Sequence, residues 1–202
     1  TEAINLLIIA NRGYNNLMIA ILYYGTVTCI LIYLICVFVY ISSLILSGIF
    51  GAPYVKTKRN LYKIIFKHAR ISKNSHIVEV GSGTGSMSIY LSKKYNCLVT
   101  GIEINPILLY ISIIKKKIFK RNKLDFVLED ALHFDYSAAS HVYVFMFPQI
   151  IRKLAPILKK QCKQGTVIIS HGFPFIPFKK YLVRKVDLEP FPIYYYELKV
   201  DI

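Results

Sequence analysis

The chain has 202 residues, a formal net charge of +15 and 54% hydrophobic residues. This length fits one ordinary domain plus an appendage, because domains cluster near roughly 100–150 residues. The basic balance suits nucleic acid or anionic lipid headgroups as partners. The four cysteines form no C-x-x-C pair and the histidines no cluster, so the sequence predicts no metal site.

The appendage is an apolar N-terminal stretch. No Asp, Glu, Lys or Arg occurs from Gly13 to Val55. Crossing a bilayer takes about 20 apolar residues, so we predict one span over 26–46, with Tyr23 and Tyr24 as interfacial aromatics. A secretory signal fits poorly because its apolar part is only about 7–15 residues long, and a buried core helix is the other alternative. We therefore expect an anchor over residues 1–50 and a second domain over residues 51–202.

The charged residues give the expected orientation of this span. All but one of the 26 Lys and Arg residues follow residue 50, and five of them lie between Lys56 and Lys67. By the positive-inside rule, the second domain is predicted on the cytoplasmic side of a membrane. The densest basic cluster consists of Lys115, Lys116, Lys117, Lys120, Arg121 and Lys123. It is either a functional patch or a solvated helix face.

A seam of small and polar side chains follows the predicted span. Its members, at spacings of three and four residues, are Thr26, Cys29, Tyr33, Cys36, Tyr40, Ser43 and Ser47. This spacing places them on one helix face. Because small and hydroxyl-bearing side chains allow close approach of helices, the seam predicts a helix–helix partner, either a second copy or a membrane-embedded substrate.

Past the apolar stretch, strand-like runs alternate with helical patterns. Helices are expected over 60–70, 86–95, 106–120 and 149–163, the last with Pro156 as a kink. Strands are expected over 76–80, 98–104, 124–128, 142–147 and 166–170, followed by a closing hairpin from 181–188 and 193–200. The order predicts an α/β fold with a parallel sheet covered on both faces. Its ligand site is expected beyond the carboxyl ends of the strands.

A glycine-rich turn follows the first predicted strand. It reads IVEVGSGTGS over 77–86, with Gly81, Gly83 and Gly85 at alternate positions. The turn lacks the last glycine of the G-x-G-x-x-G dinucleotide fingerprint, and the absence of Gly-Lys-Ser/Thr removes the P-loop alternative. Glu79, just ahead of the turn, would repel a pyrophosphate and attract a cationic group.

Two further acids stand at the ends of the next two strands. Glu103 ends the second strand, where a carboxylate can accept hydrogen bonds from both ribose hydroxyls. Asp130 follows the third strand, placed to accept a hydrogen bond from an adenine amino group. A ligand with an ammonium at one end and an adenosine at the other fits all three acids. The sequence therefore predicts S-adenosyl-L-methionine as the cofactor.

These segments resemble those of known enzymes. The runs VEVGSGTG, GIEINP and VLEDAL resemble the first three motifs of class I S-adenosylmethionine-dependent methyltransferases. More narrowly, GAPYVKT (51–57), VFMFP (144–148) and VIISHGFPF (167–175) resemble a lysine methyltransferase family. That family includes archaeal broad-specificity protein lysine methyltransferases and membrane-anchored enzymes acting on the adenine nucleotide translocase and on the ATP synthase c-subunit. The resemblance implies a Rossmann-like, seven-strand sheet and protein-lysine N-methyltransferase activity toward a membrane or membrane-associated protein.

The resemblance also implies the residues of the site. Residues 53–57 would fold over the cofactor, with Thr57 near its methionine end. The expected cofactor-binding residues are Tyr54, Val55, Thr57, Glu79, Gly81, Ser82, Gly83, Gly85, Glu103, Ile104, Asp130 and Ala131. Tyr54 and Phe147 are the candidate catalytic residues, as aromatic walls of a channel that desolvates the target lysine. Desolvation lowers the amine pKa from its ordinary value of about 10.4 and so favours the neutral nucleophile.

Three other functions stay open. A nucleic-acid amino methyltransferase suits the basic surface, but such enzymes place Asn or Asp before a Pro-Pro-Tyr-like turn, where this chain reads Phe145-Met146-Phe147-Pro148. A small-molecule or lipid methyltransferase suits the anchor, and a catalytically silent binding module would keep the same three acids. His171, at the end of the fifth strand, is a candidate base, with a structural role as the alternative.

Overall fold

The computed structural model describes residues 2–49, 55 and 57–199, without the side chains of residues 3–13 and 46–49. The chain divides into two compact units, Thr1–Ser42 and Ser43–Ile202. The first is purely helical where it is described, and the second contains every strand of the described chain.

Helix α1 (Glu2–Ile49) carries the apolar stretch. Its segment Tyr14–Ile45 has 32 residues and a mean hydropathy of 2.5, so by length and composition it can cross a membrane. The spacing of the polar seam places its residues on one face of α1. The Thr26 hydroxyl donates to the carbonyls of Leu22 and Tyr23 in the same helix, so this hydroxyl is already hydrogen-bonded without a second helix. The helix–helix partner stays a prediction, which disulfide crosslinking through Ser47→Cys would test.

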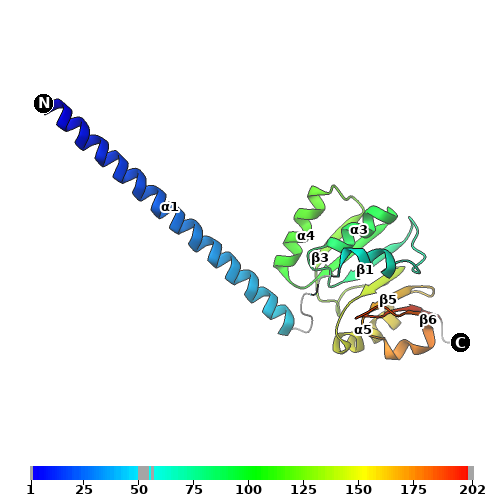
Figure 1. Ribbon diagram of the computed structural model, residues 1–202. Coiled ribbons are helices and arrows are strands. Elements are labelled where there is room, and N and C mark those ends of the chain that lie inside the picture. Colours follow the sequence, from blue (N-terminus) through cyan, green and yellow to red (C-terminus); the bar gives the residue numbers. More distant parts are fainter. Residues whose placement is uncertain (1, 50–54, 56, 200–202) are drawn as a thin grey trace. The chain divides into compact units, whose positions relative to one another are not determined.

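The second unit is built on one seven-stranded sheet in the order β3-β2-β1-β4-β5-β7-β6 (Figure 1). The strands are β1 (His76–Val80), β2 (Leu98–Glu103), β3 (Leu124–Leu128), β4 (His141–Val144), β5 (Val167–His171), β6 (Leu182–Val186) and β7 (Ile193–Glu197). The first five pair in parallel, whereas β7 is antiparallel to both β5 and β6. Strands β1, β2, β4 and β5 are almost wholly buried, as expected for strands covered on both faces.

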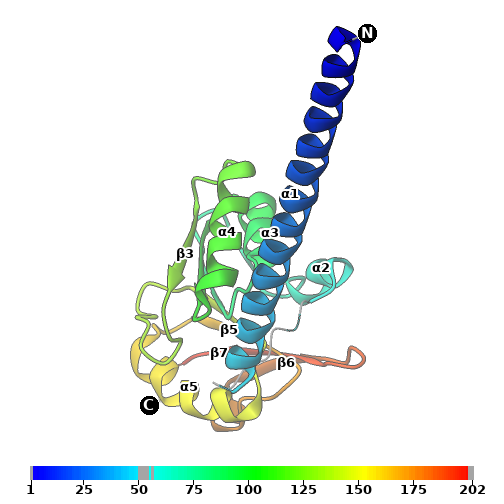
Figure 2. The same cartoon turned by 90° about the vertical axis from the view of Figure 1, so that its left-hand side faces the viewer.

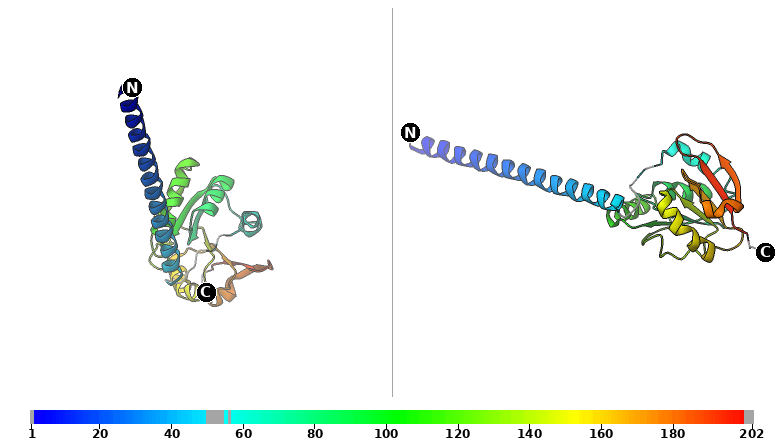
Figure 3. Two further views of the ribbon diagram at one scale, coloured as in Figure 1. Left: turned by 60° about the vertical axis from the view of Figure 1, so that its left-hand side comes forward. Right: turned by 90° about the horizontal axis from the view of Figure 1, so that it is seen from below.

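Helices cover the two faces of this sheet (Figures 1 and 3). On one face, α5 (Pro148–Gln161) packs Ile151, Leu154 and Leu158 onto the sheet. On the other, α3 (Ser86–Tyr95) packs Met87 and Leu91, next to the short α2 (Tyr62–Ile65) and its preceding 3-10 turn η1 (Arg59–Leu61). Helix α4 (Pro106–Ile118) packs against β2 and β3 at the sheet edge (Figure 2). A second 3-10 turn, η2 (Ile176–Tyr181), leads into the hairpin.

The predicted fold class is confirmed, with three local differences. The helix expected over 60–70 is only Tyr62–Ile65, because hydrogen bonds such as Lys67 N–H to the Ile64 carbonyl tighten the chain into turns. Strand β4 ends at Val144 rather than residue 147, because Pro148 begins α5 at once and Phe147 is already its N-cap. Strand β7 ends at Glu197, three residues before the predicted end.

Candidate functional site

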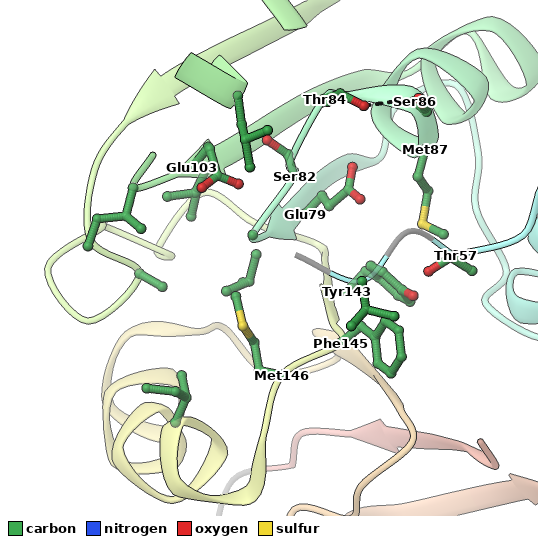
Figure 4. Close-up of a pocket in the computed structure, with 18 of the residues that line it drawn as sticks. Thr57, Glu79, Ser82, Thr84, Ser86, Met87, Glu103, Tyr143, Phe145 and Met146 are labelled. Atoms are coloured by element: carbon green, nitrogen blue, oxygen red, sulfur yellow. Dashed lines mark hydrogen bonds between the residues drawn. The ribbon is translucent and has the colours of Figure 1, made fainter. Parts of the chain in front are cut away.

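A cavity lies at the carboxyl ends of the parallel strands (Figure 4). The predicted residues that line it are Val55, Thr57, Glu79, Gly81, Ser82, Glu103, Ile104, Asp130 and Ala131. Gly83 and Gly85 belong to the same turn but do not line the cavity. Tyr54 lies outside the described residues. Strands β1, β2 and β3 therefore bring the three acids, which are far apart in the sequence, to one cavity.

The glycine turn needs its glycines for backbone reasons. Gly81 has a φ of +71°, and a Cβ built there would lie 2.3 Å from the Met146 Cε atom. Gly85 has a φ of +70°, and its Cβ would meet the Phe126 ring at 2.4 Å. Both positions have a left-handed backbone, which glycine adopts without strain, and at Gly85 the Phe126 ring and the Ser112 Cβ atom also leave no room for a side chain. A side chain at Gly81 would also narrow the cavity.

Glu103 is buried and held by the backbone of the turn. Its Oε2 accepts the Gly83 N–H at 2.7 Å, and its Oε1 accepts the Asn105 N–H at 2.9 Å. Burial raises the pKa of Glu103, and these two hydrogen bonds partly offset the rise. Each carboxylate oxygen keeps a further lone pair, so the group is fixed in orientation and still able to accept from two hydroxyls.

Glu79 lies on β1 with its side chain at the cavity and is almost completely buried. Its only hydrogen-bond donor among the described side chains is the Ser88 hydroxyl of α3. Burial raises the pKa of Glu79 to about 8, the Ser88 hydrogen bonds counteract this, and the nearby Glu103 charge adds to it. Near neutral pH this carboxyl group is therefore largely protonated, and an arriving cation would favour its ionised form.

Asp130 and Ser82 place two further polar side chains at the cavity. Asp130 uses Oδ1 to accept the Leu132 N–H at 2.9 Å, and its Oδ2 lies 3.6 Å from the His133 Nδ1 atom. The buried Ser82 hydroxyl lines the cavity without a hydrogen-bond partner among the described residues. A buried polar atom normally has a partner, so the cavity leaves Ser82 available for a bound ligand. The three acids, the bare glycine turn and this hydroxyl fit S-adenosyl-L-methionine.

The opposite side of the cavity is aromatic and apolar, and most of it was not predicted. Tyr143, Phe145 and Met146 line it from β4 and the segment that follows, and Met87 lines it from α3. In Figure 4, Tyr143 and Thr57 lie toward one end of the cavity and Glu103 toward the other. The apolar run after β4 was visible in the sequence. Which of its side chains face the cavity was not, because all residues of β4 are buried.

The Tyr143 hydroxyl forms hydrogen bonds with two neighbouring side chains. The hydroxyl lies 3.0 Å from the His171 Nδ1 atom, and a hydrogen bond with the Thr57 side chain partly offsets the rise in the Tyr143 pKa that burial causes. Burial lowers the pKa of His171 to about 4. A histidine of such low basicity accepts a proton poorly at neutral pH, so the structural alternative for His171 is favoured: it orients Tyr143.

The second predicted catalytic residue, Phe147, does not line the cavity. Its side chain is 45% exposed, and its ring meets Phe173 edge-on at 6.2 Å between centroids. Its role as a channel wall stays a prediction. Among the described residues, no group of three or more His, Cys, Asp or Glu side chains could hold a metal ion.

Comparison with known proteins places this geometry in context. A family model described as the ANTKMT methyltransferase domain matches residues 79–181. A protein-lysine N-methyltransferase of Saccharolobus islandicus (strain REY15A) is 26% identical over 137 residues, which cover 67% of this chain and 85% of that protein. The ATP synthase C-subunit lysine N-methyltransferase of Homo sapiens is 27% identical over 126 residues, covering 61% of this chain and 52% of that protein.

Relatives that act on RNA match as well. An rRNA adenine N-6-methyltransferase of Limosilactobacillus reuteri is 27% identical over 126 residues, covering 59% of this chain and 49% of that protein. The chain thus spans about half the length of the human and Limosilactobacillus relatives. An RNA methyltransferase structure from Salinibacter ruber, in complex with S-adenosyl-L-homocysteine, superposes with a TM-score of 0.69 at 27% identity, covering 73% of this chain and 96% of that one.

The fold itself recurs at lower identity. A precorrin-6y C5,15-methyltransferase structure from Geobacter metallireducens GS-15 superposes with a TM-score of 0.60 at 18% identity. It covers 72% of this chain and 90% of that one, and shows the shared fold alone.

Proposed function

Because the chain belongs to the ANTKMT methyltransferase domain family, we propose that it methylates the side-chain amine of a protein lysine. It is an S-adenosylmethionine-dependent methyltransferase, and a structural neighbour holds the demethylated cofactor product. S-adenosyl-L-methionine supplies an electrophilic methyl group on its sulfonium. The lysine nitrogen bonds to the methyl carbon as the carbon–sulfur bond breaks, and the nitrogen then loses a proton to solvent.

The observation that carries the proposal is the character of the cavity wall beyond the cofactor residues. Tyr143, Phe145 and Met146 form an apolar and aromatic wall, and no described residue of this wall is an Asn or Asp that could hold an exocyclic base amine. The lysine must be a neutral amine when it attacks, and an apolar wall lowers the amine pKa by desolvation. Aromatic rings also attract the ammonium form before it loses its proton. The lysine-specific relatives support the same acceptor.

Different residues of the cavity would bind different parts of the cofactor. Glu79 would hold the ammonium of the cofactor, and Glu103 its two ribose hydroxyls. Asp130, with Ile104 and Ala131 beside it, would bind the adenine. Val55 and Thr57 lie at the cavity, as expected for a segment that covers the cofactor. Tyr54 and Phe147 remain the proposed aromatic walls for the lysine stem.

RNA is the second candidate acceptor, and two findings favour it. The chain carries a net charge of +15, which suits a polyanion. Two of the matching proteins are named as RNA methyltransferases. The position after β4 argues the other way, because Phe145-Met146-Phe147-Pro148 offers no side-chain hydrogen-bond group to an adenine amine.

One labelling experiment distinguishes the acceptors. The full chain is incubated with native membranes, total RNA and methyl-labelled cofactor, and the products are hydrolysed to amino acids, nucleosides and lipid headgroups. We expect the label in methyllysine, removed from the macromolecular fraction by protease and unaffected by nuclease. Label in N6-methyladenosine would overturn the lysine proposal in favour of RNA, and label in lipid would overturn both.

We further propose that α1 anchors the enzyme in a membrane, with residues 51–202 on the cytoplasmic side. The apolar segment Tyr14–Ile45 and the cations that follow it support this arrangement. Tethering confines enzyme and target to one surface and raises their effective concentration. A chain lacking residues 1–50 should bind the cofactor normally but methylate native membranes about tenfold or more slowly. Equal rates for both chains would contradict the anchor.

A further inference from the structure

Helix α4 presents an apolar face to its surroundings where a surface helix would normally be polar. From Pro106 to Ile114 it has no charged residue. Its inward side is set by the buried Leu108 and Ser112. Tyr110 is 65% exposed, Ile114 41% and Ile118 68%.

Together with two half-buried isoleucines, these exposed residues form one stripe along the helix. At 100° per residue, Ile107, Tyr110, Ile111, Ile114 and Ile118 fall within an arc of roughly 100°, the width of an ordinary apolar helix face. We call these five residues the α4 stripe. A surface helix usually buries such a face and leaves charged side chains outside. Helix α4 packs one side against β2 and β3, and the α4 stripe is a second apolar face of the same helix.

The charges at the end of α4 indicate what covers the stripe. Residues 104–124 contain no acid and six cations. Three of these cations are used within the domain: the Nζ atoms of Lys115 and Lys123 donate to the carbonyls of Thr84 and Asn96, and Lys116 pairs with Asp125 at 2.5 Å. Lys117 and Lys120 are exposed beside the last turn of the stripe.

Such a pattern fits a lipid surface better than another protein. A helix that lies in a membrane interface combines an apolar face with lysines at its margin, and each lysine is attracted to anionic headgroups. A nucleic acid would use the lysines but leave the exposed Tyr110, Ile114 and Ile118 in water. We propose that the α4 stripe, with Lys117 and Lys120, binds the surface of an anionic phospholipid bilayer. This inference is independent of which acceptor the enzyme methylates.

The chain has no tryptophan, so a single one can report on the stripe. Tyr110→Trp places it in the stripe, and Lys153→Trp places a matched probe on the exposed side of α5, on the opposite face of the sheet. The full chain is reconstituted into vesicles of phosphatidylcholine with or without phosphatidylglycerol, containing lipids brominated near the headgroup. A helix in the interface buries its apolar face by about 5–10 Å, so the Tyr110→Trp probe should lose most of its fluorescence in anionic vesicles. The Lys153→Trp probe should keep its fluorescence.

A charge-reversed pair tests the electrostatic part. In the Tyr110→Trp background, Lys117→Glu with Lys120→Glu should return quenching to the level in pure phosphatidylcholine, whereas Arg152→Glu with Lys153→Glu, of equal charge change on α5, should not. Calorimetric cofactor binding checks that each variant is folded, and methyllysine formation is measured separately. An unquenched Tyr110→Trp probe would overturn the proposal. So would equal quenching with and without anionic lipid, or a spectral shift that depends only on protein concentration and thus reports a second copy.

Discussion

Glu103→Ala is expected to abolish measurable cofactor binding while the domain stays folded. The carboxylate lines the cavity and is fixed by the N–H groups of Gly83 and Asn105. Two charged hydrogen bonds to ribose hydroxyls are each worth about 1.5–3 kcal/mol. Their loss corresponds to a drop in affinity on the order of a hundredfold to ten-thousandfold. Titration calorimetry with S-adenosyl-L-methionine and with S-adenosyl-L-homocysteine measures it.

Two further variants separate binding from folding. Glu103→Gln keeps one carbonyl acceptor and should lose less affinity than Glu103→Ala. Asp135→Ala removes an exposed carboxylate away from the cavity. Within the described part of the chain this carboxylate accepts hydrogen bonds from Ser137 alone, so the variant should bind the cofactor normally. Thermal unfolding of all three should stay cooperative, because the pKa of Glu103 is raised by burial and its charge therefore does not stabilise the fold. A Glu103→Ala affinity within threefold of the native chain, by the same titration, would remove Glu103 from the cofactor site.

The sequence was most informative about the sheet. Strands β1, β2, β4 and β5 are short, largely apolar runs and are almost wholly buried, as expected for strands covered on both faces. Strand β3 was found from a similar run, although it is the partly exposed edge strand of the sheet. The acids were found for the same reason. Glu103 and Asp130 follow directly from strand ends, which a parallel sheet brings to one edge. The topology thus turns positions far apart in the sequence into neighbours, and only the strand boundaries need to be correct.

The sequence was less informative about the acceptor side of the cavity. Along a strand buried on both faces, alternation gives no hint of which face meets the ligand. The side chains of Tyr143 and Phe145 therefore could not be told from ordinary core residues. The hydrogen bond between Tyr143 and His171 depends on the pairing of β4 with β5. Phe147 was chosen from the same run. Because β4 ends early, Phe147 is the N-cap of α5, and its role as a channel wall stays a prediction.

The basic cluster could not be interpreted from the sequence for a related reason. Six neighbouring cations resemble a single solvated patch. In the structure, Lys115 binds the carbonyl of Thr84 in the glycine turn, and Lys116 pairs with Asp125 of β3. These partners come from other elements, so only the tertiary structure separates the cations that hold the domain together from those at the α4 stripe.

Glu79→Gln is expected to make the domain more stable and the enzyme a weaker binder of its cofactor. Burial raises the pKa of Glu79 from its ordinary 4.5 to about 8. The folded chain therefore keeps a proton that the unfolded chain has lost between these two values. Stability falls as pH rises through this window, and it stays at the lower level above pH 8. The Glu79→Gln variant lacks this loss of stability. Its melting temperature should therefore exceed that of the native chain by almost nothing at pH 4 and by the largest amount above pH 8.

Cofactor binding should favour the ionised Glu79 carboxylate, whereas stability of the fold favours the neutral group. The cofactor's ammonium favours ionised Glu79, so near pH 7 the native chain must release up to one proton from this carboxyl as the cofactor binds. Glu79→Gln releases none from this position, and loses a charged hydrogen bond worth about 1.5–3 kcal/mol, or roughly tenfold to a hundredfold in affinity. Calorimetry at pH 7 in two buffers of different ionisation enthalpy counts the protons. Because the cofactor's own amine contributes equally to both proteins, the difference between them isolates Glu79. Identical proton release with an unchanged affinity would show that the ammonium binds elsewhere. Suppose that Glu79→Gln is more stable than the native chain above pH 8, gains nothing at pH 4 and binds the cofactor weakly. The fold would then keep a destabilising buried carboxyl group because the cofactor requires it.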